Sequence, residues 1–349
     1  MRRLFKYAIV IKDFFFFLCF SILVLMSCDS NKKVRIGQEN AIWTEAAFFR
    51  GFNIRDSSDL AEEDILIYAN KLKDNNIKYA FIFAGPFTKE GYLPDYAFSD
   101  AAITNVKLLK EIYPGIIVLP WIGGVQSKTV QLQDSVWVTN ALNDSKRLIE
   151  TLSVTGLHFD FEFILEGNPF FDRTEIKGGS IGIESYGNNV NEFHKKFRIM
   201  MPEAFISCAI VAPSPGTKPW KRKTPLNELK VLVNYVDQIS FLYYDTYLNK
   251  QSDFEENCSS LISDIQVLRN YNSNVQYLVA IGTFINPIEL HKYRNMNIEN
   301  IPNSLNTLKN CILNLSHDKQ IVDGISIYCN WETDQNEWQQ ISKNWTGIN

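Results

Sequence analysis

The sequence lacks an excess of basic charge. Its 35 Lys and Arg residues against 39 Asp and Glu residues give a formal net charge of -4. Domains that bind nucleic acid usually present a basic face. The charge balance therefore gives no support for a nucleic-acid partner.

Metal and dinucleotide motifs are also lacking. Among 6 Cys and 4 His there is no CxxC pair and no Cys/His spacing typical of zinc sites. No Gly-rich phosphate loop follows the first predicted strand, which disfavours an open dinucleotide-binding sheet. We therefore expect no metal and no cofactor. The absence of internal repeats and linkers favours one domain and, we expect, a monomer.

The N-terminus has the pattern of an export signal. A basic leader precedes an apolar run, Phe14–Met26, that is too short to span a bilayer, which takes about 20 residues. Leu25-Met26-Ser27-Cys28 resembles a bacterial lipobox, which implies acylation of Cys28; a plain signal or an uncleaved anchor is the alternative. We expect a signal peptide over 1–27, a lipid-anchored tether over 28–45 and the folded domain over 46–349. The protein would then lie in the cell envelope, at the outer membrane or surface of a bacterium.

The four cysteines beyond the leader are widely scattered. Two of them fall in strand-like runs, which favours buried free thiols, although a disulfide stays possible in an oxidising compartment. The four are Cys208, Cys258, Cys311 and Cys329.

Short apolar runs alternate with amphipathic stretches along the rest of the chain. Eight nearly continuous apolar runs are typical of strands buried on both faces. They are Phe48–Ile54, Tyr79–Ala84, Ile116–Trp121, Leu157–Phe163, Phe205–Ala212, Gln238–Tyr244, Tyr277–Ile281 and Gly324–Tyr328. Eight strand–helix units predict a single (β/α)8 TIM barrel, with a doubly wound open sheet as the rival.

Helical periodicity fills the gaps between these runs. The predicted helices are Asp59–Leu72, Ser99–Ile112, Val136–Leu152, Val190–Met200, Leu226–Tyr235, Phe254–Leu268 and Ser304–Leu315. Two long connections remain, Leu165–Asn189 and the Pro- and Lys-rich Pro213–Pro225, which contains Trp220. Loops that follow barrel strands form the active-site face, so we expect both at its rim.

Two carboxylates stand out in the fourth predicted strand. Asp160 and Glu162 are two residues apart, so both side chains point to the same face. The alternating Phe159, Phe161 and Phe163 suit the layer beneath the helices, which leaves the acids facing the barrel interior. Crowded, partly buried carboxylates are suited to general acid/base catalysis.

The same strand resembles a glycoside hydrolase motif. Gly156-Leu157-His158-Phe159-Asp160-Phe161-Glu162 is similar to the Asp-x-x-Asp-x-Asp-x-Glu motif of glycoside hydrolase family 18, the chitinases and endo-β-N-acetylglucosaminidases. The resemblance implies that Glu162 is the general acid/base and that Asp160 supports the acetamido group of the substrate. Thr155 and His158 replace the first and middle aspartates.

Three further segments fall in the order of the family. Tyr244 and Asp245 match the end of its sixth strand, although Leu242 replaces a methionine. Tyr328, with Trp331 close by, takes the place of the tryptophan that floors the sugar site. Trp121 replaces the serine of the third-strand motif. The resemblance implies that these side chains, together with His158, form a glycan-binding set.

The resemblance also implies a mechanism. The seventh predicted strand ends Ile281-Gly282-Thr283-Phe284-Ile285-Asn286 without a carboxylate nucleophile, which fits attack by the 2-acetamido oxygen of the substrate. Only about 40 residues separate the last two strands, too few for the chitinase insertion domain, as in the endo-β-N-acetylglucosaminidase branch. We expect a glycosidase that acts on β-linked N-acetylglucosamine glycans. A non-catalytic glycan-binding lipoprotein and a barrel hydrolase of another family are the alternatives.

Overall fold

The structure is a computed structural model that describes residues 37–54, 56–126, 128–165, 183–213, 221–283, 294–315 and 320–347. All of them belong to one compact unit, Ile36–Asn349. The predicted signal, Cys28 and the first half of the predicted tether lie outside the described residues, as does Trp220. Within the described ranges, no helix is both long and apolar enough to span a bilayer.

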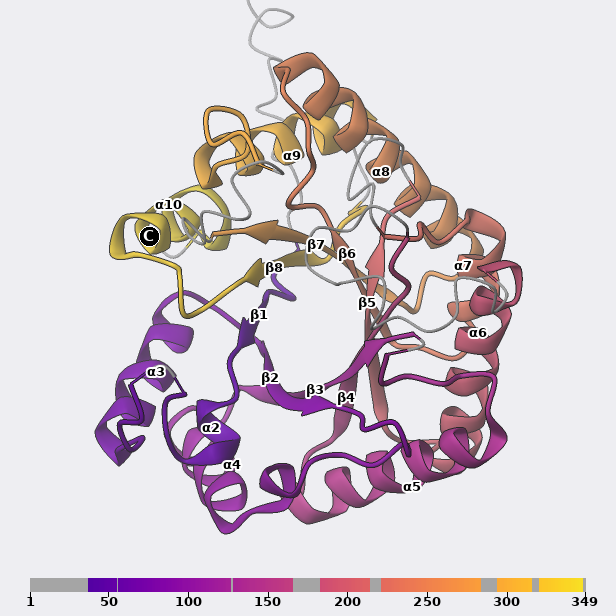
Figure 1. The fold of residues 1–349 in the computed structure, drawn as a ribbon. Coiled ribbons are helices and arrows are strands. Elements are labelled where there is room, and N and C mark those ends of the chain that lie inside the picture. Colours follow the sequence, from indigo (N-terminus) through magenta and orange to yellow (C-terminus); the bar gives the residue numbers. More distant parts are fainter. Residues whose placement is uncertain are drawn as a thin grey trace, which may run out of the picture. The chain divides into compact units, whose positions relative to one another are not determined.

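Eight parallel strands close into a barrel in the order of the sequence, from β1 to β8 and back to β1 (Figure 1). The predicted (β/α)8 barrel is confirmed, and the open sheet is excluded. The strands are β1 Ala41–Thr44, β2 Tyr79–Pro86, β3 Ile117–Val125, β4 Gly156–Glu162, β5 Phe205–Val211, β6 Gln238–Leu242, β7 Gln276–Gly282 and β8 Gly324–Tyr328.

Helices surround the barrel, as Figure 1 shows. They are α2 Ala47–Arg50, α3 Glu62–Asp74, α4 Asp100–Ile112, α5 Ser135–Leu152, α6 Ile183–Met200, α7 Leu226–Leu232, α8 Gln251–Tyr271, α9 Ile301–Leu315 and α10 Gln335–Ile341. Two of the predicted starts carry a side-chain cap, from Ser99 at α4 and from Asp134 at α5. Helix α6 begins before the predicted Val190 and shortens the predicted connection after β4.

The first predicted strand is wrong. Phe48–Ile54 overlaps the short helix α2, which Gly51 ends in a left-handed conformation with φ 75°. The first strand is Ala41–Thr44, so the barrel begins before residue 46, the predicted start of the folded domain. A short apolar run fits a buried helix turn as well as a strand. Here the side chains of Asn105 and Ser99 donate hydrogen bonds to the carbonyls of Phe48 and Phe49, respectively, and so attach this turn to α4 and its N-terminal cap.

Aromatic side chains fill both faces of β4. On the outer face, Phe159 and Phe161 pack edge-on against Phe193 of α6, with ring centroids 5.5 and 5.0 Å apart. The inner face belongs to a core that includes Trp43, Phe81, Leu119 and Tyr244. The predicted division of β4, with phenylalanines toward the helices and acids toward the interior, is therefore confirmed.

Candidate functional site

Asp160 and Glu162 lie at the C-terminal end of β4, where the strand emerges from the core. The first four residues of β4 are buried and the last three are partly exposed. Asp160 pairs in register with Gly123 of β3. A Cβ on Gly123 would lie 2.0 Å from the Asp160 carbonyl oxygen, so this close approach of the two strands requires glycine.

Trp121 holds the first of these carboxylates. Its indole Nε1 donates a hydrogen bond to Asp160 Oδ2 at 3.2 Å. The ring itself packs edge-on against Phe83, at 4.6 Å between centroids. Where the family has a serine, this chain thus has a side chain that fixes the orientation of Asp160 directly.

His158 is a core residue. It has no exposed surface and stacks on Phe81 with ring centroids 3.8 Å apart. Its Nδ1 lies 2.8 Å from Ser207 Oγ, which itself donates to Gln238 Oε1, so Nδ1 carries the proton. Burial lowers the pKa of His158 well below its usual 6.5. The expectation that His158 contacts the glycan is wrong for this conformation, because the ring is enclosed in the barrel.

Lys221 is the site residue that the sequence did not reveal. Its ammonium forms an ion pair with Glu162, and the two side chains are 14% and 19% exposed. Burial alone would lower the pKa of Lys221, but the attraction of Glu162 and Asp160 outweighs it and raises that pKa. Lys221 therefore adds a positive charge beside the carboxylate pair.

The position of Lys221 follows from backbone pairing. The backbone at Lys221 and Arg222 runs beside the end of β4, through a bridge between Ile164 and Lys221 and a 2.8 Å hydrogen bond from Arg222 N to the carbonyl of Phe163. The Pro- and Lys-rich composition had placed this connection at the rim, but composition could not show which lysine would turn inward.

Aromatic side chains at the ends of two other strands, β6 and β8, face the same region. The rings of Tyr244 and Tyr328 are stacked 4.7 Å apart and nearly parallel, and Trp331 packs edge-on against Tyr328 at 5.6 Å. Burial raises the pKa of Tyr244 well above 10, and the negative charges of Asp160 and Glu162 raise it further. Burial also raises the pKa of Tyr328, and the same two carboxylates raise it further. The structure thus brings these predicted side chains within electrostatic reach of one another.

Asp245 is enclosed by partners that the sequence did not predict. It is 6% exposed and adopts a left-handed φ of 51°. Arg294 donates to Asp245 Oδ1 at 2.9 Å, and the Glu299 carboxylate accepts from the backbone N–H of both Asp245 and Thr246. This network fixes the turn directly after Tyr244, which makes positioning of that tyrosine the clearest role for Asp245.

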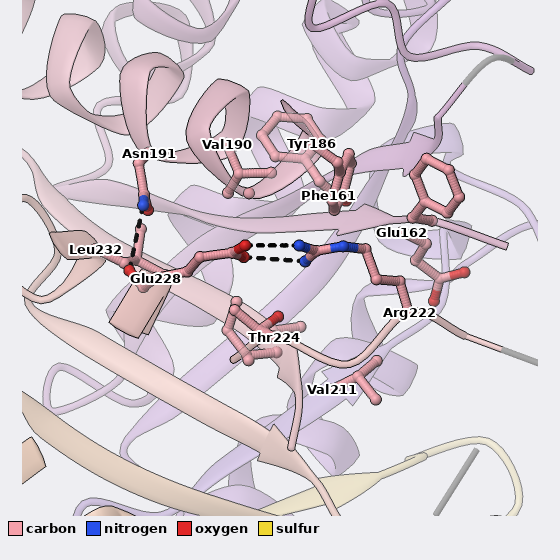
Figure 2. Close-up of a pocket in the computed structure, with 14 residues that line it drawn as sticks. Phe161, Glu162, Tyr186, Val190, Asn191, Val211, Arg222, Thr224, Glu228 and Leu232 are labelled. Atoms are coloured by element: carbon pink, nitrogen blue, oxygen red, sulfur yellow. Dashed lines mark hydrogen bonds and ion pairs between the residues drawn. The ribbon is translucent and has the colours of Figure 1, made fainter. Parts of the chain in front are cut away.

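A small cavity lies behind the site, between the outer faces of β4 and β5 and helices α6 and α7 (Figure 2). Figure 2 shows the Arg222 guanidinium directed at Glu228, with which it forms two hydrogen bonds of 2.6 and 3.0 Å. Glu162 lies at the edge of this cavity. The other residues that line the cavity are mainly apolar. The ion pair between Arg222 and Glu228 stabilises the α7 side of the barrel. Among the described side chains, no group of three or more His, Cys, Asp or Glu is arranged to hold a metal ion.

Comparison with known proteins adds the fold relationship. No protein-family model and no curated protein sequence matches the chain. The structure is similar to the spore cortex-lytic enzyme SleL of Bacillus cereus, with 11% identity, a TM-score of 0.56 and coverage of 90% of this chain and 76% of that one.

Chitinases give equally extensive matches. A chitinase from Rhizomucor miehei has 11% identity and a TM-score of 0.55 over 89% of this chain and 100% of that one. A glycoside hydrolase family 18 chitinase from Cycas revoluta, solved in complex with (GlcNAc)4, has 10% identity and a TM-score of 0.53 over 88% of this chain and 99% of that one. The predicted resemblance is confirmed at the level of the fold: the chain is a (β/α)8 barrel similar to that of a glycoside hydrolase family 18 chitinase.

Proposed function

We propose that the protein hydrolyses glycans that contain β-linked N-acetylglucosamine. The observation that carries this proposal is the pair of partly exposed carboxylates, Asp160 and Glu162, at the mouth of the barrel within electrostatic reach of Tyr244 and Tyr328. Stacked aromatic rings beside two acids suit the apolar face of a sugar ring and the polar atoms of its acetamido group. The fold similarity to chitinases supports the same substrate class.

The proposed reaction is substrate-assisted. The acetamido oxygen attacks the anomeric carbon while the Glu162 carboxyl gives its proton to the departing glycosidic oxygen. The resulting carboxylate then takes a proton from a water molecule, whose oxygen opens the cyclic intermediate. Asp160 accepts a hydrogen bond from the acetamido N–H, and Trp121 keeps Asp160 oriented for this contact.

The Lys221 ion pair sets a condition on this reaction. Glu162 can donate a proton only when its carboxyl is protonated, and protonation removes the closest counter-charge of Lys221. Asp160 and Asp245 also attract that ammonium, so they stabilise it while the Glu162 carboxyl is protonated. When the substrate binds, its glycosidic oxygen would accept the proton from Glu162, and the resulting carboxylate would pair with Lys221 again.

A non-catalytic glycan-binding protein is the second candidate, and the same ion pair favours it. A carboxylate held by a buried ammonium is suited to accepting hydrogen bonds from sugar hydroxyls without giving up a proton. This candidate predicts glycan affinity without turnover, and affinity that persists in Glu162→Gln.

A panel of substrates separates these functions. The purified protein would be incubated with an N-glycoprotein, chitooligosaccharides, peptidoglycan and matched oligosaccharides that lack the 2-acetamido group, and the products would be identified by mass spectrometry. Cleavage restricted to acetamido sugars is expected. Cleavage of sugars without that group would favour a hydrolase of another mechanism, and binding without cleavage of any would establish the second candidate.

We further propose that the protein is exported and lipid-anchored through Cys28, on the strength of the N-terminal sequence. Cells fed radiolabelled palmitate should label the wild-type protein but not Cys28→Ala. Equal labelling of the two would overturn the lipid anchor.

A further inference from the structure

The described part of the chain contains four cysteines, all buried and free, and two of them lie on neighbouring helices. Cys258 is in α8 and Cys311 is in α9, and these two helices pack side by side at the outside of the barrel (Figure 1). Both residues are enclosed, with 0% and 4% exposure. The other two, Cys208 in β5 and Cys329 just after β8, belong to strands that are not neighbours in the barrel.

The sulfur of Cys311 lies over the helical turn that carries Cys258. It is 3.3 Å from Ser259 Oγ and 3.7 Å from the carbonyl oxygen of Glu255. Those two groups flank Cys258 within one turn of α8. The Cys311 sulfur therefore faces the turn of α8 in which Cys258 lies. The packing of α8 against α9 thus places the two cysteines on the same contact between the helices.

The contact makes the two thiols chemically unequal. The interaction with Cys258 lowers the pKa of Cys311 to about 7, although burial opposes the shift. The same interaction and burial raise the pKa of Cys258 well above 9. The thiolate form is thus favoured at Cys311 and the protonated thiol at Cys258. In thiol–disulfide exchange, the first suits the attacking cysteine and the second the resolving cysteine.

We propose that Cys258 and Cys311 form a disulfide that joins α8 to α9. The thiolate of Cys311 attacks a disulfide-bearing oxidant and expels one of its sulfurs as a thiolate. Cys258 then loses its proton and attacks the sulfur of Cys311, which expels the second thiolate. The two cysteines are oxidised and the oxidant is reduced to two thiols. Because both sulfurs are buried in the folded chain, the exchange takes place as the two helices pack.

This disulfide is independent of the proposed enzymatic function, since α8 and α9 lie outside the carboxylate site. It would close a loop of about 50 residues, long enough for a substantial restriction of the unfolded chain. The predicted export signal would deliver the chain to a compartment where disulfides persist.

The test is to refold the purified full chain in a mixture of reduced and oxidised glutathione. Remaining thiols would be alkylated under denaturing conditions and the peptides mapped without reduction. The expected product is a linked peptide pair that contains Cys258 and Cys311, while Cys208 and Cys329 are alkylated. The link should disappear in Cys311→Ser and persist in the matched control Cys208→Ser.

Thermal unfolding of the wild-type protein, with and without reductant, is a second test of the disulfide and needs no variant. Reductant should lower the Tm of the refolded wild-type protein by about 5 °C or more. Full alkylation of Cys258 and Cys311 after oxidative refolding would overturn the proposal, and so would linkage of either one to a different cysteine.

Discussion

The ion pair between Glu162 and Lys221 leads to a prediction about stability that does not depend on any substrate. Replacing either residue by a neutral one of similar size leaves a charge in a largely enclosed site. Glu162→Gln strands the Lys221 ammonium, and Lys221→Met strands the Glu162 carboxylate. The double variant has neither charge.

The expected magnitude follows from the burial of the two side chains. Breaking a fully buried pair from one side costs about 3–5 kcal/mol. Here the side chains keep 14% and 19% exposure, and Asp160 remains as a second counter-charge for Lys221. We therefore expect each single variant to lose about 2 kcal/mol of unfolding free energy. The double variant should also lose about 2 kcal/mol, so the coupling is about 2 kcal/mol.

Urea unfolding of the four proteins, followed by circular dichroism, measures this coupling. The exposed pair Glu192 and Lys195 on α6, at 57% and 43% exposure, is a matched control for the same substitutions. Its coupling should be below about 0.5 kcal/mol. A coupling between Glu162 and Lys221 as small as that of the control would refute the ion pair at the centre of the site.

Three further predictions follow from single contacts. Trp121→Phe keeps the ring but removes the N–H that holds Asp160, so kcat/KM should fall about 10- to 30-fold in the hydrolysis assay; an unchanged value would contradict the positioning role of Trp121. His194 is buried, and burial lowers its pKa to about 4. In the unfolded chain the same imidazole binds a proton near pH 6.5, whereas in the folded chain it stays neutral at that pH. Stability therefore falls as pH drops below 6.5, and urea titration should show the wild type losing about 2 kcal/mol more than His194→Leu between pH 8 and pH 5; a pH-independent difference would speak against it. Gly123→Ala places a Cβ 2.0 Å from the Asp160 carbonyl oxygen, and thermal unfolding should show a Tm several degrees lower; an unchanged Tm would mean that β3 and β4 are less tightly paired.

Much of the fold could be predicted because buried parallel strands have a strong sequence pattern. Seven of the eight predicted runs overlap strands of the barrel, from β2 to β8. The exception is the first, where the true strand Ala41–Thr44 has only four residues and the apolar run Phe48–Ile54 is longer. Length and hydrophobicity favoured the wrong segment, and only pairing with β2 and β8 distinguishes the right one.

The site was predictable where it depends on strand periodicity. Asp160 and Glu162 share a face because side chains alternate along a strand, and Tyr244 lies two residues after the end of β6, near the predicted end of that strand. The contacts of Lys221 and Trp121 with these acids were not predictable, since they join residues 59 and 39 positions apart through side-chain orientation. The enclosure of His158 was missed for a similar reason, because Phe81 covers it from β2.

The most direct test of the proposed function compares wild type with Glu162→Gln on one chitooligosaccharide. Hydrolysis would be followed by mass spectrometry and oligosaccharide binding by calorimetry on the same preparations. We predict that Glu162→Gln loses at least about 100-fold in hydrolysis rate while it still binds the oligosaccharide. Equal hydrolysis rates in the two proteins, or binding without hydrolysis in the wild type, would contradict the assignment of Glu162 as the acid/base.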